Sequence, residues 1–409
     1  MKIRTFITVL FSCIAIALVM PSGIEIDISG DGFPVRYVGA ASFLPIAQEE
    51  NEDAVLTPEP KVVVMFEPIA DIVSDLEPVY DEIAEPTPEP EPEPTPEPEP
   101  EPDPIVTITV SAAGDTTLGG CVERITYSVF MRVFRENNED MTYFLRNVRH
   151  IFMQDDLTLL NLECALTNET RHRGKTYNYK GEYRMAEVLS SSGVDAASLA
   201  NNHTDDFFAK GYQDTKDALT EFGVAYFGNE TNRIIEIKGI KVGLYGHLVW
   251  HDSREMRNKT KASIDDLKEK GAELIIGYFH WGVDRANVPS SQQRNHAHFA
   301  IDNGTDLILG AHPHVIQGIE EYKGKNIVYS LGNFAYGGHM NPEDKDTFIF
   351  QQTFTFDNGV LLEDNEINII PAYVSSLRNT NNYQPMIAEG DEAERILGRI
   401  ERFSAQIGR

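Results

Sequence analysis

The sequence is poor in cysteine, and the shortage excludes two kinds of protein. Three cysteines occur among 409 residues, with no CxxC or zinc-ribbon spacing. Neither a disulfide scaffold nor a cysteine-based zinc site can be built from them. Cys121 and Cys164 leave two alternatives, one disulfide outside the cell or two free thiols, because sequence alone does not place them within bonding distance.

Basic residues are also scarce. The chain has 35 Lys and Arg against 64 Asp and Glu, a formal net charge of −29. Nucleic-acid binding needs a basic face that neutralises phosphates, so no nucleic-acid partner is expected. The acidic excess is concentrated between Glu49 and Pro104, where 19 acidic residues accompany a single base, Lys61.

One long apolar run, Phe6–Met20, lies near the amino terminus. Lys2 and Arg4 precede it, and no further Lys or Arg appears before Arg36. The positive-inside rule therefore places the amino terminus in the cytoplasm and the rest of the chain outside. Residues 1–22 are predicted to be a signal anchor, which makes the chain a single-pass cell-membrane protein with an extracellular C-terminal domain. The alternative is a cleaved signal peptide and a secreted protein, although no clear cleavage site follows the run.

Residues 23–104 are predicted to form an extended or disordered, acidic, proline-rich linker. Proline occupies alternate positions through most of Glu85–Pro104. Each proline fixes its own φ and disfavours helix at the preceding residue, which favours polyproline II. We interpret this segment as a spacer, and the alternative is a tail that binds cations or a partner.

Beyond Pro104 the pattern becomes that of a folded domain, predicted to span 105–409. Apolar strand candidates alternate with helical patterns, which is typical of a layered α/β fold. The predicted strands are Ile105–Ala112, Leu157–Leu162, Val194–Leu199, Lys241–Tyr245, Glu273–Phe279, Thr305–Leu309 and Asn326–Leu331. The predicted helices are Gly211–Phe222, Ser263–Lys270 and Ser290–Asn303, followed by an antiparallel strand pair, Thr347–Phe356 and Gly359–Ile370.

Polar residues gather where these strands end. The segments GD, NLE, ANNH, HWG, GAHPH and SLGNF each follow or close a predicted strand. Ligand sites assemble at the carboxyl ends of strands in α/β folds, because neighbouring loops converge there. Carboxylate, amide and imidazole side chains drawn from separate strands are ligands suited to Zn²⁺, Mn²⁺ or Fe. The sequence therefore predicts a transition-metal site.

In this order and spacing, GDTTLGG, NLE, ANNHTDD, HWG, GAHPHVIQ and YSLGNF resemble the CapA family of poly-γ-glutamate capsule synthesis proteins. That family is related to calcineurin-like metallophosphoesterases, and the resemblance covers about residues 107–375. It implies a four-layer αββα sandwich of two mixed sheets, with the site at one edge of the packed sheets.

The resemblance also implies a ligand set: Asp115, Glu163, Asn202, His280, His312 and His314. Glu163 would be the carboxylate that bridges two metals. Asn202, His280 and His312 would complete one metal site, whereas Asp115 and His314 would contribute to the second.

One departure from the superfamily pattern weakens the second site. The first motif of metallophosphoesterases is Asp-x-His, but the sequence here reads Asp115-Thr116-Thr117. The expected cofactor is therefore one firmly held divalent transition metal (Mn, Zn or Fe) and a weaker second.

Further roles follow from the same resemblance. His203 would be the catalytic proton donor, and Asp206 would orient a ligand. Lys175 and Lys180 would pair with an anionic substrate, or would simply be solvated. Asn333 would hydrogen-bond near the site, or would cap a turn.

Two functions are consistent with these residues. The first is a metal-dependent hydrolase or transferase that acts outside the membrane on an anionic polymer such as poly-γ-glutamate. The second is a non-catalytic accessory protein that holds the polymer through its metal site. Other capsule-synthesis membrane proteins are candidate partners in both cases.

Overall fold

The computed structural model describes residues 105–363 and 366–408. The predicted anchor and linker lie outside the described residues, and the domain boundary at 105 stays a prediction. Within the described ranges, no helix is long and apolar enough to cross a membrane. The α-helices of this part are α2 (Thr126–Glu136), α3 (Arg149–Phe152), α4 (Ala186–Ser190), α5 (Phe208–Glu221), α6 (Arg254–Glu269), α7 (Ser291–Asp302) and α8 (Gly390–Ser404).

The larger sheet is mixed. Its strand order is β18-β17-β15-β1-β3-β6-β7, with β14 paired to β1 and β16 to β15. β1 runs parallel to β3 and antiparallel to β15, so the direction changes in the middle of the sheet. Its strands are β1 (Val106–Thr117), β3 (Leu157–Leu162), β6 (Ala196–Ser198), β7 (Ala225–Phe227), β14 (Asn333–Tyr336), β15 (Asp346–Asp357), β16 (Val360–Leu361), β17 (Glu366–Tyr373) and β18 (Met386–Ile387).

The second sheet has the order β12-β13-β11-β10-β9-β8, in which β9, β10, β11 and β13 are parallel and both edge strands are antiparallel. Its strands are β8 (Arg233–Ile237), β9 (Ile240–Val249), β10 (Leu274–Trp281), β11 (Leu307–Ala311), β12 (Ile319–Tyr322) and β13 (Lys325–Val328). A small third sheet holds β2 (Gly120–Cys121), β4 (Ala165–Leu166) and β5 (Tyr179–Gly181). The predicted α/β class with mixed sheets is confirmed.

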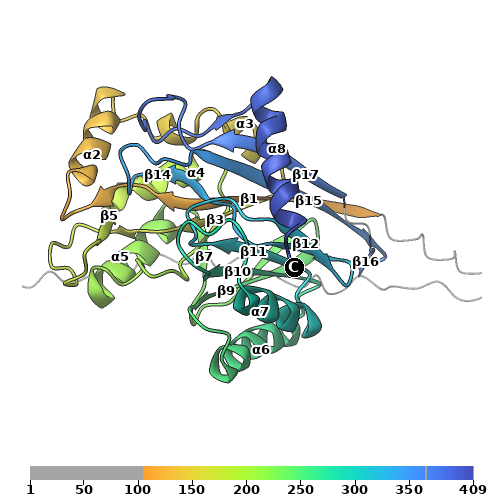
Figure 1. The fold of residues 1–409 in the computed structure, drawn as a ribbon. Coiled ribbons are helices and arrows are strands. Elements are labelled where there is room, and N and C mark those ends of the chain that lie inside the picture. The colour runs from red at the N-terminus through yellow and green to blue at the C-terminus, as the bar shows by residue number, and fades with distance from the viewer. Residues whose placement is uncertain (1–104, 364–365, 409) are drawn as a thin grey trace, which may run out of the picture. The chain divides into compact units, whose positions relative to one another are not determined.

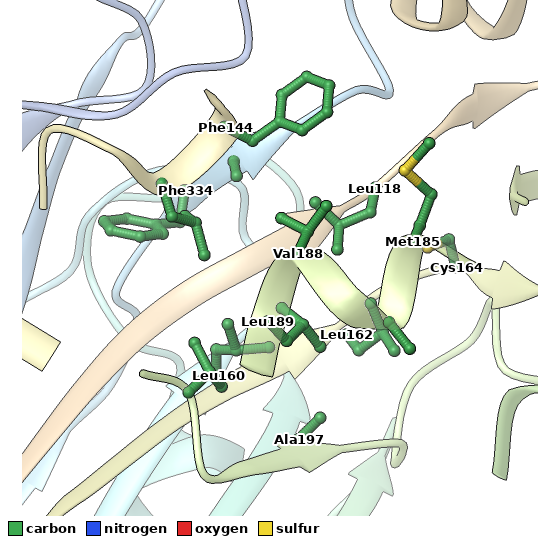
Figure 2. Packing of buried hydrophobic residues seen from close by; sticks show 14 of the residues in the cluster. Leu118, Phe144, Leu160, Leu162, Cys164, Met185, Val188, Leu189, Ala197 and Phe334 are labelled. Atoms are coloured by element: carbon green, nitrogen blue, oxygen red, sulfur yellow. The ribbon is translucent and has the colours of Figure 1, made fainter. Parts of the chain in front are cut away.

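Three hydrophobic cores hold the layers together. The first joins the larger sheet to α2, α3, α4 and α5; Figure 2 shows Phe144, Leu189 and Phe334 within it. The second contains side chains from both large sheets, together with the apolar face of α8. The third joins β9, β10 and β11 to α6 and α7, which lie together over one sheet in Figure 1. The two large sheets therefore share a core, and helices cover their outer faces.

The predicted strand Asn326–Leu331 is wrong at its end. β13 stops at Val328, and the chain then crosses to the larger sheet, where β14 pairs in parallel with β1. Gly332 makes this crossing possible because it adopts φ +75°, a conformation that favours glycine. Gly114 on β1 allows the close approach, since a Cβ there would lie 1.9 Å from the Gly332 carbonyl oxygen.

Both cysteines of this domain are free thiols, buried in the first core. Burial raises the pKa of Cys164 to about 12 and also raises the pKa of Cys121, whose thiol donates to Glu123. The sequence left open either one disulfide or two free thiols, and the structure contains two free thiols.

Candidate metal centre

The six predicted ligands converge where the carboxyl ends of strands from both large sheets meet. Asp115 lies near the end of β1, Glu163 directly after β3, and Asn202 in the loop after β6. His280 lies near the end of β10, and His312 and His314 follow β11. The sheets are tied together here, because the Tyr278 hydroxyl on β10 donates to the Ala113 carbonyl on β1 at 2.7 Å.

The two histidines after β11 are held in unusual backbone conformations. His312 has φ +98° and His314 φ +58°, values that non-glycine residues rarely adopt. The backbone N–H of His312 donates to Asp115 Oδ2 at 3.1 Å, which anchors this turn to the larger sheet. Strained backbone of this kind concentrates at functional sites, where the surrounding structure stabilises it.

Glu163 is the central carboxylate of the cluster. It is fully buried, and both of its oxygens lack a hydrogen-bond partner within the described residues. Its Oε1 lies 3.5 Å from His280 Nε2, and its Oε2 lies 3.8 Å from His314 Nδ1. Burial and the adjacent charge of Asp115 raise the pKa of Glu163 well above its ordinary range. A buried carboxylate without partners is costly unless a cation neutralises it.

Asp115 and His314 form a charged pair beside Glu163. Burial alone would raise the pKa of Asp115, but the hydrogen bond and charge of His314 outweigh it, with help from His280 and Asn161, and lower it to about 2. Burial opposes charge on His314 as well, but Glu163 and Asp115 raise its pKa to about 10. His314 Nδ1 lies 3.3 Å from Asp115 Oδ2. In the metal-free protein, the His314 imidazolium therefore partly replaces a cation.

The other two imidazoles are kept neutral. Burial lowers the pKa of His280 well below its ordinary range, and burial followed by the charge of His314 lowers that of His312. Neutral imidazole is the form that binds metals. His280 Nε2 lies 2.7 Å from Asn202 Oδ1, and the buried Nδ1 of His312 has no partner among the described residues.

The donor set fits a divalent cation. Ligand atoms of Glu163, His280 and His312 lie within 4.8 Å of one another, and so do those of Asp115, Glu163 and His314. Glu163 belongs to both groups, as expected of a bridging carboxylate. The unpartnered oxygens of Glu163 and nitrogen of His312 are further evidence that the cluster suits a metal.

The chain is similar to known bacterial proteins. The family model of the bacterial capsule synthesis protein PGA_cap matches residues 109–337, more than half of the chain. The chain belongs to the PGA_cap family. The domain of this family has a metallophosphoesterase-like fold, and the matched residues contain all six predicted ligands.

Three relatives of this PGA_cap chain are 27%, 27% and 23% identical to it. The capsule biosynthesis protein CapA of Bacillus anthracis is 27% identical over 283 residues, 62% of this chain and 66% of that protein. The PGA biosynthesis protein CapA of Bacillus subtilis (strain 168) is 27% identical over 248 residues, 55% of this chain and 62% of that protein. A probable polyglutamine synthesis accessory protein of Mycobacterium tuberculosis is 23% identical over 288 residues, 62% of this chain and 73% of that protein. The chain thus spans just under two thirds of the length of each Bacillus relative.

Thr117 occupies the position of the missing histidine in this PGA_cap domain. Its side chain is fully buried, and its hydroxyl donates to the backbone carbonyl of Glu163 at 3.1 Å. The hydroxyl therefore supports the loop that carries Glu163. The second group of ligand atoms has to rely on Asp115, Glu163 and His314.

Asp284 is a candidate ligand that the sequence analysis missed. Its Oδ1 lies 3.3 Å from His312 Nε2, and its carboxylate forms a third group with His312 and His314. Its side chain is 67% exposed, so it lies at the solvent side of the centre. The signal was present in the sequence, because only Val283 separates Asp284 from the HWG motif.

Two amides that the sequence analysis also missed connect the ligands. Asn161 Nδ2 donates to Asp115 Oδ1 at 2.7 Å and lies 3.2 Å from His280 Nδ1. Asn201 Nδ2 donates to Asn161 Oδ1, and Asn201 Oδ1 accepts from the backbone N–H of His203. Such hydrogen bonds fix the orientation of metal ligands. Both residues lie within the motifs, NLE and ANNH, next to residues assigned as ligands.

His203 lies beside the ligands and is oriented by Asp206. His203 Nδ1 is 2.7 Å from Asp206 Oδ2, and its Nε2 is 4.0 Å from Glu163 Oε1. Asp206 is fully buried, and Lys175 Nζ donates to its other oxygen at 2.8 Å. Lys175 also donates to the Asn202 carbonyl at 2.7 Å, so it supports the site from the wall of the cleft.

Of the remaining predicted residues, Asn333 and Lys180, only the first lies at the site. Asn333 is at the site, where its Oδ1 lies 2.9 Å from His314 Nδ1. Lys180 is not brought to the cluster. Its ammonium donates to the Glu169 carbonyl and lies over the Phe207 ring, because β5 pairs with β2 and β4 in the small sheet. Lys180 does not line the cleft described below, and the prediction that it pairs with a substrate stays a prediction.

A cleft of ≈ 840 Å³ opens onto the centre. His203, His312 and His314 line it, and so does the loop that contains Asn341 and Asp344. A substrate of several heavy atoms can reach the ligands directly.

The ligand assignment predicts a difference between histidines. His280→Ala and His312→Ala should each lose most bound metal, because each removes a donor that no neighbour can replace. Elemental analysis of the purified protein should show close to one firmly bound transition metal in the unmodified chain, with a second bound weakly. His298→Ala is the matched control, since His298 packs on Tyr322 and binds Glu320 away from the cluster. Full metal content in both ligand variants would contradict the assignment.

Proposed function

We propose that the chain is a metal-dependent hydrolase or transferase of capsule polymer synthesis that works outside the cytoplasmic membrane. The observation that carries this proposal is the buried Glu163, whose two unpartnered oxygens face imidazoles from separate strands. The names of the Bacillus relatives refer to capsule and PGA biosynthesis. Poly-γ-glutamate or a related anionic polymer is the proposed substrate class.

The metal would be held by Glu163, His280, His312 and Asn202, with Asp115 and His314 forming the second position. When bound, it would polarise the scissile group and lower the pKa of a bound water. The residues of the chain retain the cation and orient its ligands. Asp115 and Glu163 supply the negative charge that retains the cation, and Asn161 keeps Asp115 and His280 in place.

His203 is proposed as the proton donor to the leaving group. The hydrogen bond between Nδ1 and Asp206 fixes the ring and leaves Nε2 facing the centre, so Nε2 is the atom from which the imidazolium would transfer its proton. Lys175 and the backbone N–H of Tyr179 bind the two oxygens of Asp206 and hold it in place. A proton donor beside a metal-bound group is the arrangement that general acid catalysis needs.

The alternative is an accessory protein that holds the polymer through its metal without turning it over. One specific observation favours it: Thr117 stands in place of a histidine ligand and uses its hydroxyl on the Glu163 backbone. The Mycobacterium relative is named an accessory protein. Other membrane proteins of capsule synthesis are the proposed partners in either case.

His203→Ala separates the two functions. It should retain the metal, because the ring is not assigned as a ligand. If the protein is an enzyme, hydrolysis of bis(p-nitrophenyl) phosphate by the metal-loaded chain should fall about 10²–10⁴-fold. His339→Ala is the control, since His339 also lines the cleft but is not assigned to the centre. Normal capsule formation in His203→Ala, with no hydrolysis by the unmodified chain, would favour the accessory function, and loss of metal would refute the role given to His203.

The membrane location is also a proposal, supported by Lys2 and Arg4 before the apolar run. Protease added to intact, wall-stripped cells should digest the domain while a cytoplasmic marker protein survives. The readout is an immunoblot against the domain. Protection of the domain until the cells are permeabilised would show that the orientation is the reverse.

A further inference from the structure

Two tyrosines form a hydroxyl pair in the cleft. Tyr179 on β5 and Tyr336 on β14 have hydroxyl oxygens 3.0 Å apart, and each residue is only 6% exposed. The Tyr179 ring centroid lies 4.1 Å from that of His203, and the Tyr336 centroid lies 5.2 Å from that of His314. Both tyrosines line the cleft. The pair therefore lies beside both the proposed proton donor and the metal ligands.

The hydrogen-bond count leaves one proton of this pair unused. Two hydroxyls carry two donor protons, and the bond between Tyr179 and Tyr336 uses one of them. Neither hydroxyl has another hydrogen-bond partner among the described residues. The ordinary pKa of a phenol is about 10, so both hydroxyls are protonated at neutral pH. The remaining proton is available to a group that enters the cleft.

A glycine packs tightly against these hydroxyls. Gly338 also lines the cleft, and a Cβ at this position would lie 2.5 Å from the Tyr336 hydroxyl oxygen and 3.0 Å from Tyr179 Cζ. Any side chain there would press on the pair. Glycine at this position therefore lets the pair keep its place in the lining of the cleft.

The Lys and Arg side chains of the cleft each have a carboxylate neighbour. Lys175 binds Asp206 and the Asn202 carbonyl, and Arg285 lies 3.6 Å from the Glu343 carboxylate. With Lys175 and Arg285 so engaged, the groups that an anionic ligand can meet beside His203 and His314 include neutral donors. The tyrosine pair is such a donor, and it lies next to the metal centre.

We propose that Tyr179 and Tyr336 form a substrate-binding subsite, which donates a hydrogen bond to an anionic oxygen of the substrate beside the metal centre. A phosphate or a carboxylate oxygen would satisfy it. This inference rests on the proposed function, since it takes the cleft to be the place where the polymer binds. It adds the groups that recognise the charged oxygen.

The test compares binding in metal-loaded proteins by isothermal titration calorimetry. The variants are Tyr179→Phe, Tyr336→Phe and the double variant, which keep both rings. A hydrogen bond to a charged group is worth enough for the double variant to bind the probe about 10- to 100-fold more weakly. The effects of the two single variants on binding should not add up to the effect of the double variant. The two sites are coupled, because one hydroxyl acts through the other.

The two probes are inorganic phosphate and a synthetic γ-linked glutamate oligomer. Weaker phosphate binding identifies a phosphate oxygen as the ligand, and weaker binding of the oligomer alone identifies a carboxylate. Gly338→Ala keeps both hydroxyls and should also weaken binding, because its methyl group would displace the Tyr336 hydroxyl. Tyr245→Phe is the control: the Tyr245 hydroxyl is likewise 2.7 Å from another hydroxyl, that of Thr305, but lies in the third core.

The pair has one rival role, a purely structural link between β5 and β14. In that case the phenylalanine variants would melt at lower temperature but bind both probes as tightly as the unmodified protein, and the inference would be refuted. If the unmodified, metal-loaded protein binds neither probe, the proposed function fails together with the inference. Metal analysis of every variant confirms that the centre itself is unchanged.

Discussion

The structure depends on two carboxylates that are buried together. Asp115 and Glu163 are both fully buried, and their oxygens lie within 4.8 Å of each other and of a His314 nitrogen. Two charges of the same sign in a low-dielectric interior repel each other strongly and are poorly solvated. The raised pKa of Glu163 reflects this repulsion and burial, whereas His314 keeps the pKa of Asp115 low. A divalent cation between the two carboxylates would offset the repulsion.

The surrounding fold keeps this unfavourable arrangement in place. Glu163 follows a strand whose six residues are all buried, and β1 lies between β3 and β15 in the larger sheet. The turn that carries His312 and His314 is anchored through the backbone N–H of His312 to Asp115. Packing of two sheets and their helices thus stabilises a centre that is costly in the absence of metal, which is the usual relation between a scaffold and its functional site.

Much of the fold and of the site could be predicted from the sequence, because both have local signals. β3 was predicted at its observed bounds, since a continuous apolar run is typical of a strand buried on both faces. The ligands stood out because polar residues directly after such strands have few structural reasons to be there. The helix predicted at Ser263–Lys270 was shorter than α6. The first half of α6, from Arg254 to Lys261, is almost entirely polar and has no apolar periodicity that would have predicted it.

Other features could not be predicted because they depend on tertiary contacts. The crossing from β13 to β14 requires Gly332 to meet Gly114 on a strand more than two hundred residues earlier. Lys180 was grouped with Lys175 by proximity in sequence, but strand alternation directs its side chain to Glu169. The Tyr179–Tyr336 pair joins two sheets that no local pattern relates.

The most direct test of the account is the thermal stability of Glu163→Gln with and without Mn²⁺. The raised pKa of Glu163 means that its charged form costs stability, and that this cost grows as pH rises through the pKa in the folded protein. At neutral pH and without metal, the amide should therefore melt at the same temperature as the unmodified chain or higher. Metal at about 100 times its Kd should stabilise the unmodified chain by about 2.7 kcal/mol, and the variant far less. An equal Mn²⁺-induced shift in both proteins, or a lower melting temperature of the metal-free variant, would contradict the claim that Glu163 is the buried carboxylate that a metal neutralises.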